Sequence, residues 1–374
     1  MLTNRKDILF ILKTSRNKTT GFYMMNNYVY NSSFIRGKYN VSFVLLNSFS
    51  LKNPFLNSLG NILNVIKYSG IIFYRLITLR PRLIYFTISP VNAFFRDLVY
   101  VFVIKIFKSK VVYHLHGKGI KEKYDRSNIY HFFYEWAYRN VYVIALSEKL
   151  KYDFEYLRIN KYYIVPNAIP DYIKKNKIEL KSVKNKNGVL KIVFLSNLIL
   201  SKGILDFIDA IKLLSNETSK FQAYIIGNES EITASVINKK IEGYEEFIQF
   251  IGPLYNNKKL KFIQKCNLLV FPTYYKTETW GLVILEAMQL GLPVITTDEG
   301  ATTDMIEDGV NGYIVNKKDP EDIKDKLLKF INQPSLIDEM GKINREKYLN
   351  KFSIDTFENN LSQVFDNLLK HNYE

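Results

Sequence analysis

The sequence predicts an α/β protein made of two doubly wound domains that face each other across a cleft. A length of 374 residues suits two domains. Short continuous apolar runs alternate with longer helical patterns, as parallel strands alternate with helices. A highly charged stretch without apolar periodicity separates two such sets. We therefore expect an N-terminal domain over 1–171, a linker over 172–188 and a C-terminal domain over 189–352. A helix over 353–374 follows, and its return to the N-terminal domain is one option.

The first half of the chain contains continuous apolar runs rich in Val, Ile and Tyr, as buried parallel strands are. The predicted strands cover 7–12, 41–46, 83–88, 111–115 and 141–146, and a sixth short strand begins the stretch 161–171 and leads into a turn. Helical patterns lie between them at 58–79, 91–108 and 129–139. Because ligands of such open sheets bind beyond the carboxyl ends of the strands, the residues after each strand are the first site candidates.

The second half repeats this alternation, so both domains are expected to be Rossmann-like. The predicted strands cover 190–195, 223–227, 247–252, 267–271 and 293–297. Lys202-Gly203 opens one predicted helix, another begins at Asn257, and a third covers 320–331. No sustained internal repeat or low-complexity segment is visible.

Composition limits the classes of protein. A hydrophobic fraction of 47% provides for large cores and argues against global disorder. The single cysteine, Cys266, excludes an internal disulfide framework and fits a reducing compartment. The apolar run near the N-terminus fits a first buried strand better than a signal peptide. No run reaches about 18 uninterrupted apolar residues, so no transmembrane helix is expected. The nearest candidate, 93–107, carries charges and fits a buried or interfacial helix.

The net charge of +16 is concentrated in one region. Between Arg75 and Arg126 lie eleven basic residues and only three acidic ones. A solvated lysine-rich surface would explain this charge, and so would attraction to anionic lipid headgroups. The aromatic stretch YHFFYEWAY at 130–138 suits a membrane interface. Nucleic-acid binding is a third option, but no recognition motif for it appears. We favour the membrane surface.

The most informative stretch is 271–295, FPTYYKTETWGLVILEAMQLGLPVI. It predicts a loop with Glu278, followed by a short helix that begins near Gly281, contains Glu286 and ends at Gly291. Thr277 or Thr279 could cap the start of this helix. A helix start attracts anions, phosphate above all. Two hydroxyl-binding carboxylates that flank a phosphate site suit a nucleotide sugar.

Two strand ends in the first half are further candidates. The strand at 111–115 leads into His116-Gly117, and alternation places His114 and His116 on the same face of the sheet. A metal pair is conceivable there, but further ligand spacing is lacking nearby. His116 is therefore a site candidate in its own right. The polar loop after the first strand holds Gly21, where the backbone could approach a ligand or simply turn.

These motifs resemble the glycosyltransferase family 4 branch of the GT-B glycosyltransferases. The resemblance rests on an E-x7-E signature from Glu278 to Glu286, and on a loop at 196–203 that resembles G-R-L-x-x-x-K-G. His116-Gly117, the turn VPN at 165–167 and the stretch DGVNG at 308–312 add to it. The match is strong over 190–316 and mostly architectural over 1–170.

The resemblance implies retaining transfer of a sugar, as a hexosyltransferase, from a UDP- or GDP-linked donor. Glu286 would hold the ribose hydroxyls, and Glu278 would contact the donor sugar. Lys202 would sit on the diphosphate, and His116 would lie beside the donor sugar as a catalytic residue. The backbone around Trp280, Gly281 and Leu282 would meet the distal phosphate. Further donor-binding candidates are Gly21, Asn197, Gly227, Leu254 and Thr279.

The chain departs from the family pattern at Asn197, where Arg is usual, so a bidentate charged group is lost. Thr279 replaces a frequent Gly. No D-x-D motif occurs, so neither a metal nor another cofactor is expected. The expected acceptor is a lipid-linked saccharide in surface polysaccharide synthesis, such as O-antigen, capsule or exopolysaccharide. The expected location is the cytoplasm, on the inner face of the plasma membrane. A glycoside hydrolase that uses both glutamates, and an inactive GT-B subunit that docks on a membrane partner, remain the alternatives.

Overall fold

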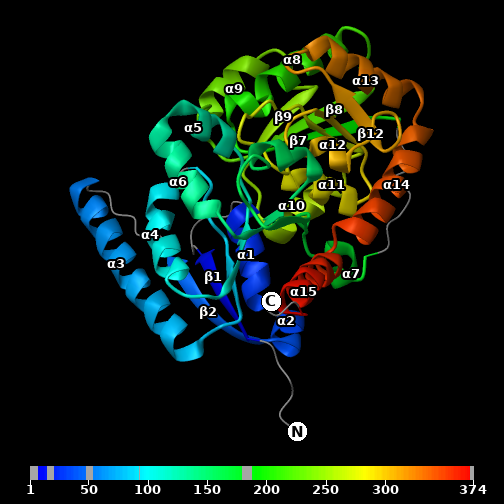
Figure 1. Ribbon diagram of the computed structural model, residues 1–374. Coiled ribbons are helices and arrows are strands. Elements are labelled where there is room, and N and C mark those ends of the chain that lie inside the picture. Colours follow the sequence, from blue (N-terminus) through cyan, green and yellow to red (C-terminus); the bar gives the residue numbers. More distant parts are fainter. Residues whose placement is uncertain (1–6, 15–20, 48–53, 92, 179–187, 371–374) are drawn as a thin grey trace. The chain divides into compact units, whose positions relative to one another are not determined.

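In the computed structural model the chain divides into two compact units, which are described separately (Figure 1). Unit 1 comprises Met1–Asn167 and Phe357–Glu374, and unit 2 comprises Ala168–Thr356. The structure describes residues 7–14, 21–47, 54–91, 93–178 and 188–370. The expected linker at 172–188 therefore lies partly outside the described residues.

Unit 1 is built on a six-stranded parallel sheet with strand order β2-β1-β3-β4-β5-β6. Its strands are Asp7–Thr14 (β1), Asn40–Asn47 (β2), Leu83–Phe86 (β3), Lys110–His114 (β4), Tyr142–Ala145 (β5) and Lys161–Ile164 (β6). The inner strands are almost entirely buried, which explains why their sequences are continuous apolar runs rather than alternating ones. The predicted doubly wound sheet is confirmed.

Helices cover this sheet and complete the core of unit 1. They are Gly21–Asn31 (α1), Ser33–Lys38 (α2), Pro54–Leu79 (α3), Phe94–Lys105 (α4), Ile120–Arg126 (α5), Asn128–Tyr138 (α6), the 3-10 turn Glu148–Asp153 (η1) and Ile354–Lys370 (α15). Most of α15 belongs to unit 1. Phe365 of α15 packs edge-on against Phe10 of β1 with ring centroids 5.6 Å apart, and the Tyr39 hydroxyl donates to Asp366 at 2.9 Å.

Helix α3 bears on the expectation that no helix spans a membrane. Within the described residues its segment Asn57–Leu79 is, by length and composition, apolar enough to cross a membrane. This segment has no uninterrupted apolar run of that length because Asn, Ser, Lys and Arg interrupt it, yet its mean hydropathy is 1.4. Ala93–Phe107, the nearest candidate in the sequence, instead contains α4, which has one buried and one exposed side.

Unit 2 has a second six-stranded parallel sheet, with strand order β12-β11-β10-β7-β8-β9. Its strands are Leu190–Leu195 (β7), Phe221–Ile226 (β8), Ile248–Gly252 (β9), Leu268–Phe271 (β10), Val294–Thr297 (β11) and Gly312–Val315 (β12). Its helices are Tyr172–Asn176 (α7), the 3-10 turn Leu200–Lys202 (η2), Ile204–Ser215 (α8), Ala234–Ile241 (α9), Asn256–Ile263 (α10), Leu282–Gln289 (α11), Thr302–Met305 (α12), Pro320–Asn332 (α13) and Ser335–Lys351 (α14).

Strand β12 was not predicted, because Asn311-Gly312 indicated only a turn. Gly312 begins the strand and pairs with Val294 of β11. A Cβ at Gly312 would lie 2.1 Å from the Val294 carbonyl oxygen, so β12 can approach β11 only with glycine there. The residue that suggested a turn is thus the one that permits the pairing.

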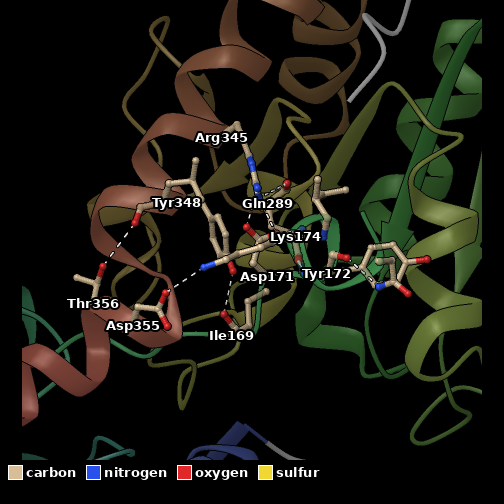
Figure 2. Close-up of polar contacts among 12 residues, drawn as sticks. Ile169, Asp171, Tyr172, Lys174, Gln289, Arg345, Tyr348, Asp355 and Thr356 are labelled. Carbon is tan, nitrogen blue, oxygen red and sulfur yellow. Dashed lines mark hydrogen bonds and ion pairs between the residues drawn. The ribbon is translucent and has the colours of Figure 1, made fainter. Parts of the chain in front are cut away.

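The segment that enters unit 2 is fixed to α14 and α11 (Figure 2). Asp171 caps α7 by accepting from Ile173 N at 3.0 Å, and it forms an ion pair with Arg345 of α14 at 2.6 Å. The Tyr348 hydroxyl donates to Ile169 O at 2.8 Å, and Tyr172 N donates to the Gln289 side chain at 2.9 Å. Part of the expected linker is therefore an ordered, anchored helix.

Each sheet has one place where the strand order reverses direction. In unit 1 the chain runs from β1 to β2 on one side and returns to β3 on the other side of β1. In unit 2 it runs from β7 through β8 to β9 and returns to β10 on the other side of β7. In open parallel sheets ligands bind at the carboxyl ends of the strands beside this reversal. The two reversals direct attention to the residues after β1 and β3, and to those after β7 and β10.

Candidate functional site

The reversal point of unit 2 carries an ion pair between residues that are 76 positions apart in the sequence. Lys202 ends η2 after β7, and Glu278 lies in the loop after β10. The Lys202 ammonium contacts the Glu278 carboxylate, and both side chains are mostly buried, with exposures of 14% and 11%. The same ammonium lies 4.5 Å from the ring centroid of Tyr275. These contacts hold the ammonium group in a defined position at the edge of the sheet.

Glu278 also organises the start of α11. One of its carboxylate oxygens accepts from Gly281 N at 3.1 Å. Gly281 is the N-cap residue of the helix and has φ +62°, a left-handed conformation that favours glycine. As a glycine it provides no side-chain cap. The expected cap by Thr277 or Thr279 is therefore wrong. The physical reason is that Glu278, three residues before Gly281, reaches the backbone N–H that a threonine cap would have taken.

Glu286 lies in the second turn of α11 and is 8% exposed. One carboxylate oxygen accepts from Lys259 of α10 at 2.6 Å. The other, Oε2, is buried and finds no hydrogen-bond partner among the described residues. A buried acceptor without a partner costs about 1–3 kcal/mol. A ligand hydroxyl or an ordered water is a donor that would supply the missing bond.

Lys259 is a site residue that the sequence did not reveal. It lies in a lysine-rich helix, where nothing local distinguishes it from its exposed neighbour Lys258. Its side chain reaches Glu286 of α11, which is 27 positions away in the sequence. The one available signal was that a nearly buried Glu286 requires a cation or several donors.

Two glycines of the predicted site allow its loops to lie close together. Gly203 adopts φ +79°, and a Cβ there would lie 2.3 Å from the Pro272 carbonyl oxygen. A Cβ on Gly227 would lie 1.8 Å from the Ser196 carbonyl oxygen. Any side chain at these positions would push apart the loops that follow β7, β8 and β10, and with them Lys202 and Glu278.

The remaining predicted donor-binding residues of unit 2 have different environments. Asn197 is exposed, and its side chain accepts from Asn228 at 3.2 Å. Leu254 is half-buried after β9, and Leu282 is the first residue of α11. Thr279 is nearly buried, and its carbonyl oxygen accepts from Ala301 N at 3.1 Å.

Trp280 is a core residue in this structure. It is almost fully buried and packs edge-on against Phe352 with ring centroids 5.7 Å apart. Its indole N–H has no partner among the described residues. The side chain therefore anchors the loop between Glu278 and α11, and only its backbone remains a candidate for ligand contact.

In unit 1, His114 and His116 lie on the same face, as predicted, with ring centroids 4.1 Å apart. His114 is fully buried, and its Nδ1 lies 2.5 Å from the Tyr85 hydroxyl. His116 lies just beyond β4, and the Phe22 ring meets it edge-on at 5.6 Å. Burial lowers the pKa of His116 to about 4, although the neighbouring Asn167 side chain opposes this change. Both imidazoles are thus uncharged near neutral pH.

The reversal point of unit 1 carries a Lys–carboxylate pair that the sequence analysis did not identify. Lys13 at the end of β1 contacts Asp97 of α4 and donates to Ser89 Oγ at 2.6 Å. Arg96 also reaches Asp97, at 3.0 Å. Burial lowers the pKa of Lys13 to about 8, and the attraction of Asp97 opposes this shift. The sequence feature that points to this pair is Lys13, a charged residue that directly follows the apolar run of the first strand.

Two other predictions concern Gly21 and metal ions. Gly21 is the first residue of α1, and the loop before it, 15–20, lies outside the described residues. Within the described part of the chain no group of three or more His, Cys, Asp or Glu side chains could hold a metal ion.

Residues 175–347 match the family model described as Glycosyl transferases group 1. An uncharacterised glycosyltransferase from Methanocaldococcus jannaschii is 28% identical over 242 residues, which cover 60% of this chain and 65% of that protein. The capsular polysaccharide biosynthesis glycosyltransferase CapM from Staphylococcus aureus is 27% identical over 238 residues, which cover 61% of this chain and 62% of that protein. The matched region thus spans less than two thirds of the length of these relatives.

Two solved structures show similar folds over nearly the whole chain. Anabaena HepE, in complex with UDP and glucose, has a TM-score of 0.70 at 18% identity and covers 97% of this chain and 100% of its own. The lipopolysaccharide outer core galactosyltransferase WaaB has a TM-score of 0.69 at 15% identity and covers 96% and 99%. At these identities the likeness establishes the GT-B fold class alone.

Proposed function

Because unit 2 carries a Glycosyl transferases group 1 domain, we propose that the protein is a glycosyltransferase that takes its sugar from a nucleoside diphosphate donor. The proposal includes retention of the anomeric configuration and transfer of a hexose. The acceptor that we propose is a lipid-linked saccharide of a surface polysaccharide.

The observation that carries the proposal is the Lys202–Glu278 ion pair at the reversal point of unit 2. A departing diphosphate gains negative charge as the bond to the sugar breaks. A cation that is already positioned there stabilises this charge in the transition state without having to be oriented during the reaction. Glu278 keeps Lys202 in place and can in turn accept hydrogen bonds from sugar hydroxyls.

Glu286 supports the nucleoside half of the donor site. Its buried Oε2 lacks a partner, and a ribose hydroxyl is a donor that would supply one. Lys259 holds the other oxygen and so orients the carboxylate. HepE was solved with UDP and also with UDP-glucose, which supports a UDP-linked donor as the first to test, with GDP sugars second.

The proposed reaction needs no second carboxylate as a base, because the leaving phosphate takes the acceptor proton. The acceptor hydroxyl oxygen bonds to the anomeric carbon as the bond from that carbon to the diphosphate oxygen breaks on the same face. The electron pair of that bond remains on the diphosphate, and the acceptor proton passes to a leaving phosphate oxygen. His116 enters this proposal as an uncharged imidazole that assists the acceptor or the leaving group.

Because Asn197 is uncharged, the proposal assigns the diphosphate contact mainly to Lys202. Its amide interacts with Asn228 and contributes no charge. Lys202 is then the residue that we propose as the main diphosphate contact, and loss of its charge should not be compensated by position 197.

The acceptor class and the location rest on different support. The relatives include an enzyme of capsule synthesis, and the structural neighbours include one of lipopolysaccharide outer core synthesis. We propose a cytoplasmic enzyme on the inner face of the plasma membrane, which is consistent with its single cysteine, Cys266.

Two alternatives from the sequence remain testable. A glycoside hydrolase would use Glu278 and Glu286 as acid and nucleophile and would have no need of Lys202. An inactive GT-B subunit would keep the fold but would need neither His116 nor Glu278 for polysaccharide production.

The test is thermal unfolding of the full chain with UDP-, GDP- and ADP-linked sugars at sub-millimolar concentration. A ligand at about 100 times its Kd adds about 2.7 kcal/mol, which raises the unfolding temperature by several degrees. Lys202→Ala should remove at least about half of the shift, whereas Lys276→Ala, an exposed lysine of the same loop, should retain it in full. Absence of a shift with every nucleotide sugar would refute the proposal.

A further inference from the structure

The positive charge of the chain belongs almost entirely to unit 1. Unit 1 contains 26 basic and 11 acidic residues, a net charge of +15, whereas unit 2 contains 26 and 25, a net charge of +1. Residues 54–121 contain ten basic residues and one acidic residue, Asp97. Asp97 is fully buried and pairs with Lys13 and with Arg96, one of these ten, so it leaves the positive charge of the remaining nine unopposed within this segment.

Helix α3, within this basic region, has an apolar stripe that its own unit does not cover. Tyr68, Ile72 and Leu76 are spaced by four residues and are buried in the core of unit 1. A second series points outward and is exposed: Leu59, Ile62, Ile66, Phe73 and Ile77. Its spacing of three, four or seven residues places it along one line of the helix. A helix that is apolar on two sides must meet a second apolar surface or leave one exposed.

Helix α4 repeats this arrangement beside α3 (Figure 1). Phe95, Val99, Phe102 and Ile106 follow each other at four, three and four residues, and all are exposed, Phe102 by 60%. Phe73 of α3 meets Phe107 at the end of α4 with ring centroids 5.8 Å apart. We define the outward series of α3 and α4 together as the apolar face. An exposed apolar surface of this extent indicates a binding surface.

A cavity of about 480 Å³ lies where α3 and α4 end. Leu76, Ile77 and Phe107 contribute apolar walls. The basic residues that line it are Arg80, Arg82, Lys108 and Lys110. Arg82 and Lys110 donate to the carbonyl oxygens of Leu369 and Leu368 at 3.0 and 2.8 Å, so the last turn of α15 holds them in place. The cavity thus joins an apolar interior to a positively charged wall, which suits an anionic amphiphile.

We propose that unit 1 docks on an anionic phospholipid bilayer through the apolar face, with an acidic headgroup at the basic residues of the cavity. The bilayer is the occupant that matches both observations at once, since a row of apolar side chains beside concentrated positive charge complements acyl chains beneath negative headgroups. This inference rests on the membrane location proposed above and names the surface that would make the contact, but it does not depend on the reaction proposed for unit 2.

The structure also decides how α3 meets the bilayer. The segment Asn57–Leu79 is long and apolar enough to cross a membrane, with only 17% of its most apolar window buried. Crossing, however, would remove Tyr68, Ile72 and Leu76 from the core of unit 1. The helix therefore lies in the interface with its outward side in the lipid, and the protein is peripheral rather than membrane-spanning.

The test is co-sedimentation of the full chain with vesicles of phosphatidylcholine alone and of phosphatidylcholine with 30% phosphatidylglycerol. We expect binding to the anionic vesicles that weakens as salt rises. Phe102→Glu and Ile66→Glu should each reduce the bound fraction at least tenfold. The control is Val236→Glu on α9 of unit 2, where a valine is 45% exposed outside the apolar face. It should bind like the unaltered chain.

A second pair of variants tests the basic wall. Arg80→Gln with Lys108→Gln should remove the preference for anionic vesicles, whereas Lys239→Gln with Lys240→Gln, on exposed positions of α9, should preserve it. The unfolding temperature of every variant and its protection by nucleotide sugars should remain unchanged, which shows that folding and the donor site are intact.

Several results would overturn the proposal. One is the absence of binding to anionic vesicles, and another is equal binding by Phe102→Glu and the unaltered chain. A third is a stable dimer without vesicle binding that Phe102→Glu converts to monomer, because a second copy would then cover the apolar face. Membrane fractions that retain the protein after alkaline carbonate extraction would show that α3 spans the bilayer, contrary to the proposal.

Discussion

Each unit has a lysine–carboxylate pair at the point where its strand order reverses, but the two pairs differ in their burial. In each pair the lysine lies at or just beyond the carboxyl end of the first strand of its unit. The pairs are Lys13 with Asp97 in unit 1 and Lys202 with Glu278 in unit 2. In unit 1 the pair is essentially sealed, with side-chain exposures of 5% and 0%. In unit 2 the exposures are 14% and 11%, and a nearly buried glutamate, Glu286, follows in the next helix.

This difference in burial suggests two roles for one arrangement. A sealed pair cannot exchange partners with a ligand, so its contribution is to the stability of the fold. The partly exposed Lys202–Glu278 pair, at the carboxyl ends of the strands, allows Lys202 to turn toward an incoming phosphate. The location in the fold therefore identifies a candidate site, and accessibility then decides between structure and function.

The largest expected effect is on the sealed pair. Lys13→Ala should lower the free energy of unfolding by about 3–5 kcal/mol, because Asp97 is then left buried with only Arg96 as a charged partner. Chemical denaturation of the unaltered chain and of Lys13→Ala measures this effect. Replacing both residues, as Lys13→Met with Asp97→Leu, should recover most of the loss, and failure to recover would mean that the unpaired Asp97 charge is not its cause.

Lys202→Ala should lower activity strongly and stability only slightly. We expect a loss of roughly 100- to 1000-fold in kcat/KM for sugar transfer, as for removal of one transition-state donor. Its free energy of unfolding should change little by comparison with Lys13→Ala. The exposed Lys276→Ala is the matched control, and equal activity of Lys202→Ala and Lys276→Ala would contradict the assignment.

A third effect distinguishes the units by pH. The folded-state pKa of His116 is about 4, because burial disfavours the charged imidazole, whereas the unfolded value is about 6.5. The unfolded chain then binds more protons between these values, so this contribution to stability is present above pH 6.5 and is lost as the pH falls toward 4. His116→Gln should remove up to about 1.4 kcal/mol per pH unit of this dependence.

Denaturation at several pH values between 4 and 7 measures this slope for both chains. Variants of unit 2 such as Lys276→Ala should keep the full slope. An unchanged slope in His116→Gln would show that burial does not shift the titration of this imidazole.

The smallest effect is expected at Lys259. Lys259→Ala should raise the KM for the donor roughly tenfold, because Glu286 loses a charge-assisted bond of about 1.5–3 kcal/mol that orients it. Lys258→Ala, the adjacent exposed lysine, should leave the KM unchanged. Steady-state kinetics with the donor varied would measure both, and identical KM values would remove Lys259 from the site.

The sequence predicted what is encoded locally. Buried parallel strands such as Leu190–Leu195 are continuous apolar runs, and the helix around Glu286 is bounded by Gly281 and Gly291. His114 and His116 share a face because strand alternation requires it.

The missed features depend on distant residues. The partners Lys13 and Asp97 are 84 positions apart, and Lys259 and Glu286 are 27 positions apart on two different helices. The sequence places the start of α11 near Gly281 and offers Thr277 or Thr279 as its cap, whereas the fold brings the Glu278 carboxylate to the Gly281 N–H. The apolar face was hidden because sequence periodicity alone does not show which of two apolar stripes is covered.

The central claim is that Lys202 at the reversal point of unit 2 receives the donor diphosphate. Calorimetric titration with the nucleotide sugar that gives the largest thermal shift tests it directly, with the unaltered chain, Lys202→Ala, Lys13→Ala and Lys276→Ala compared at a temperature where all are folded. We predict sub-millimolar binding by all except Lys202→Ala, whose affinity should fall at least tenfold. Equal affinity of Lys202→Ala and the unaltered chain would contradict the claim.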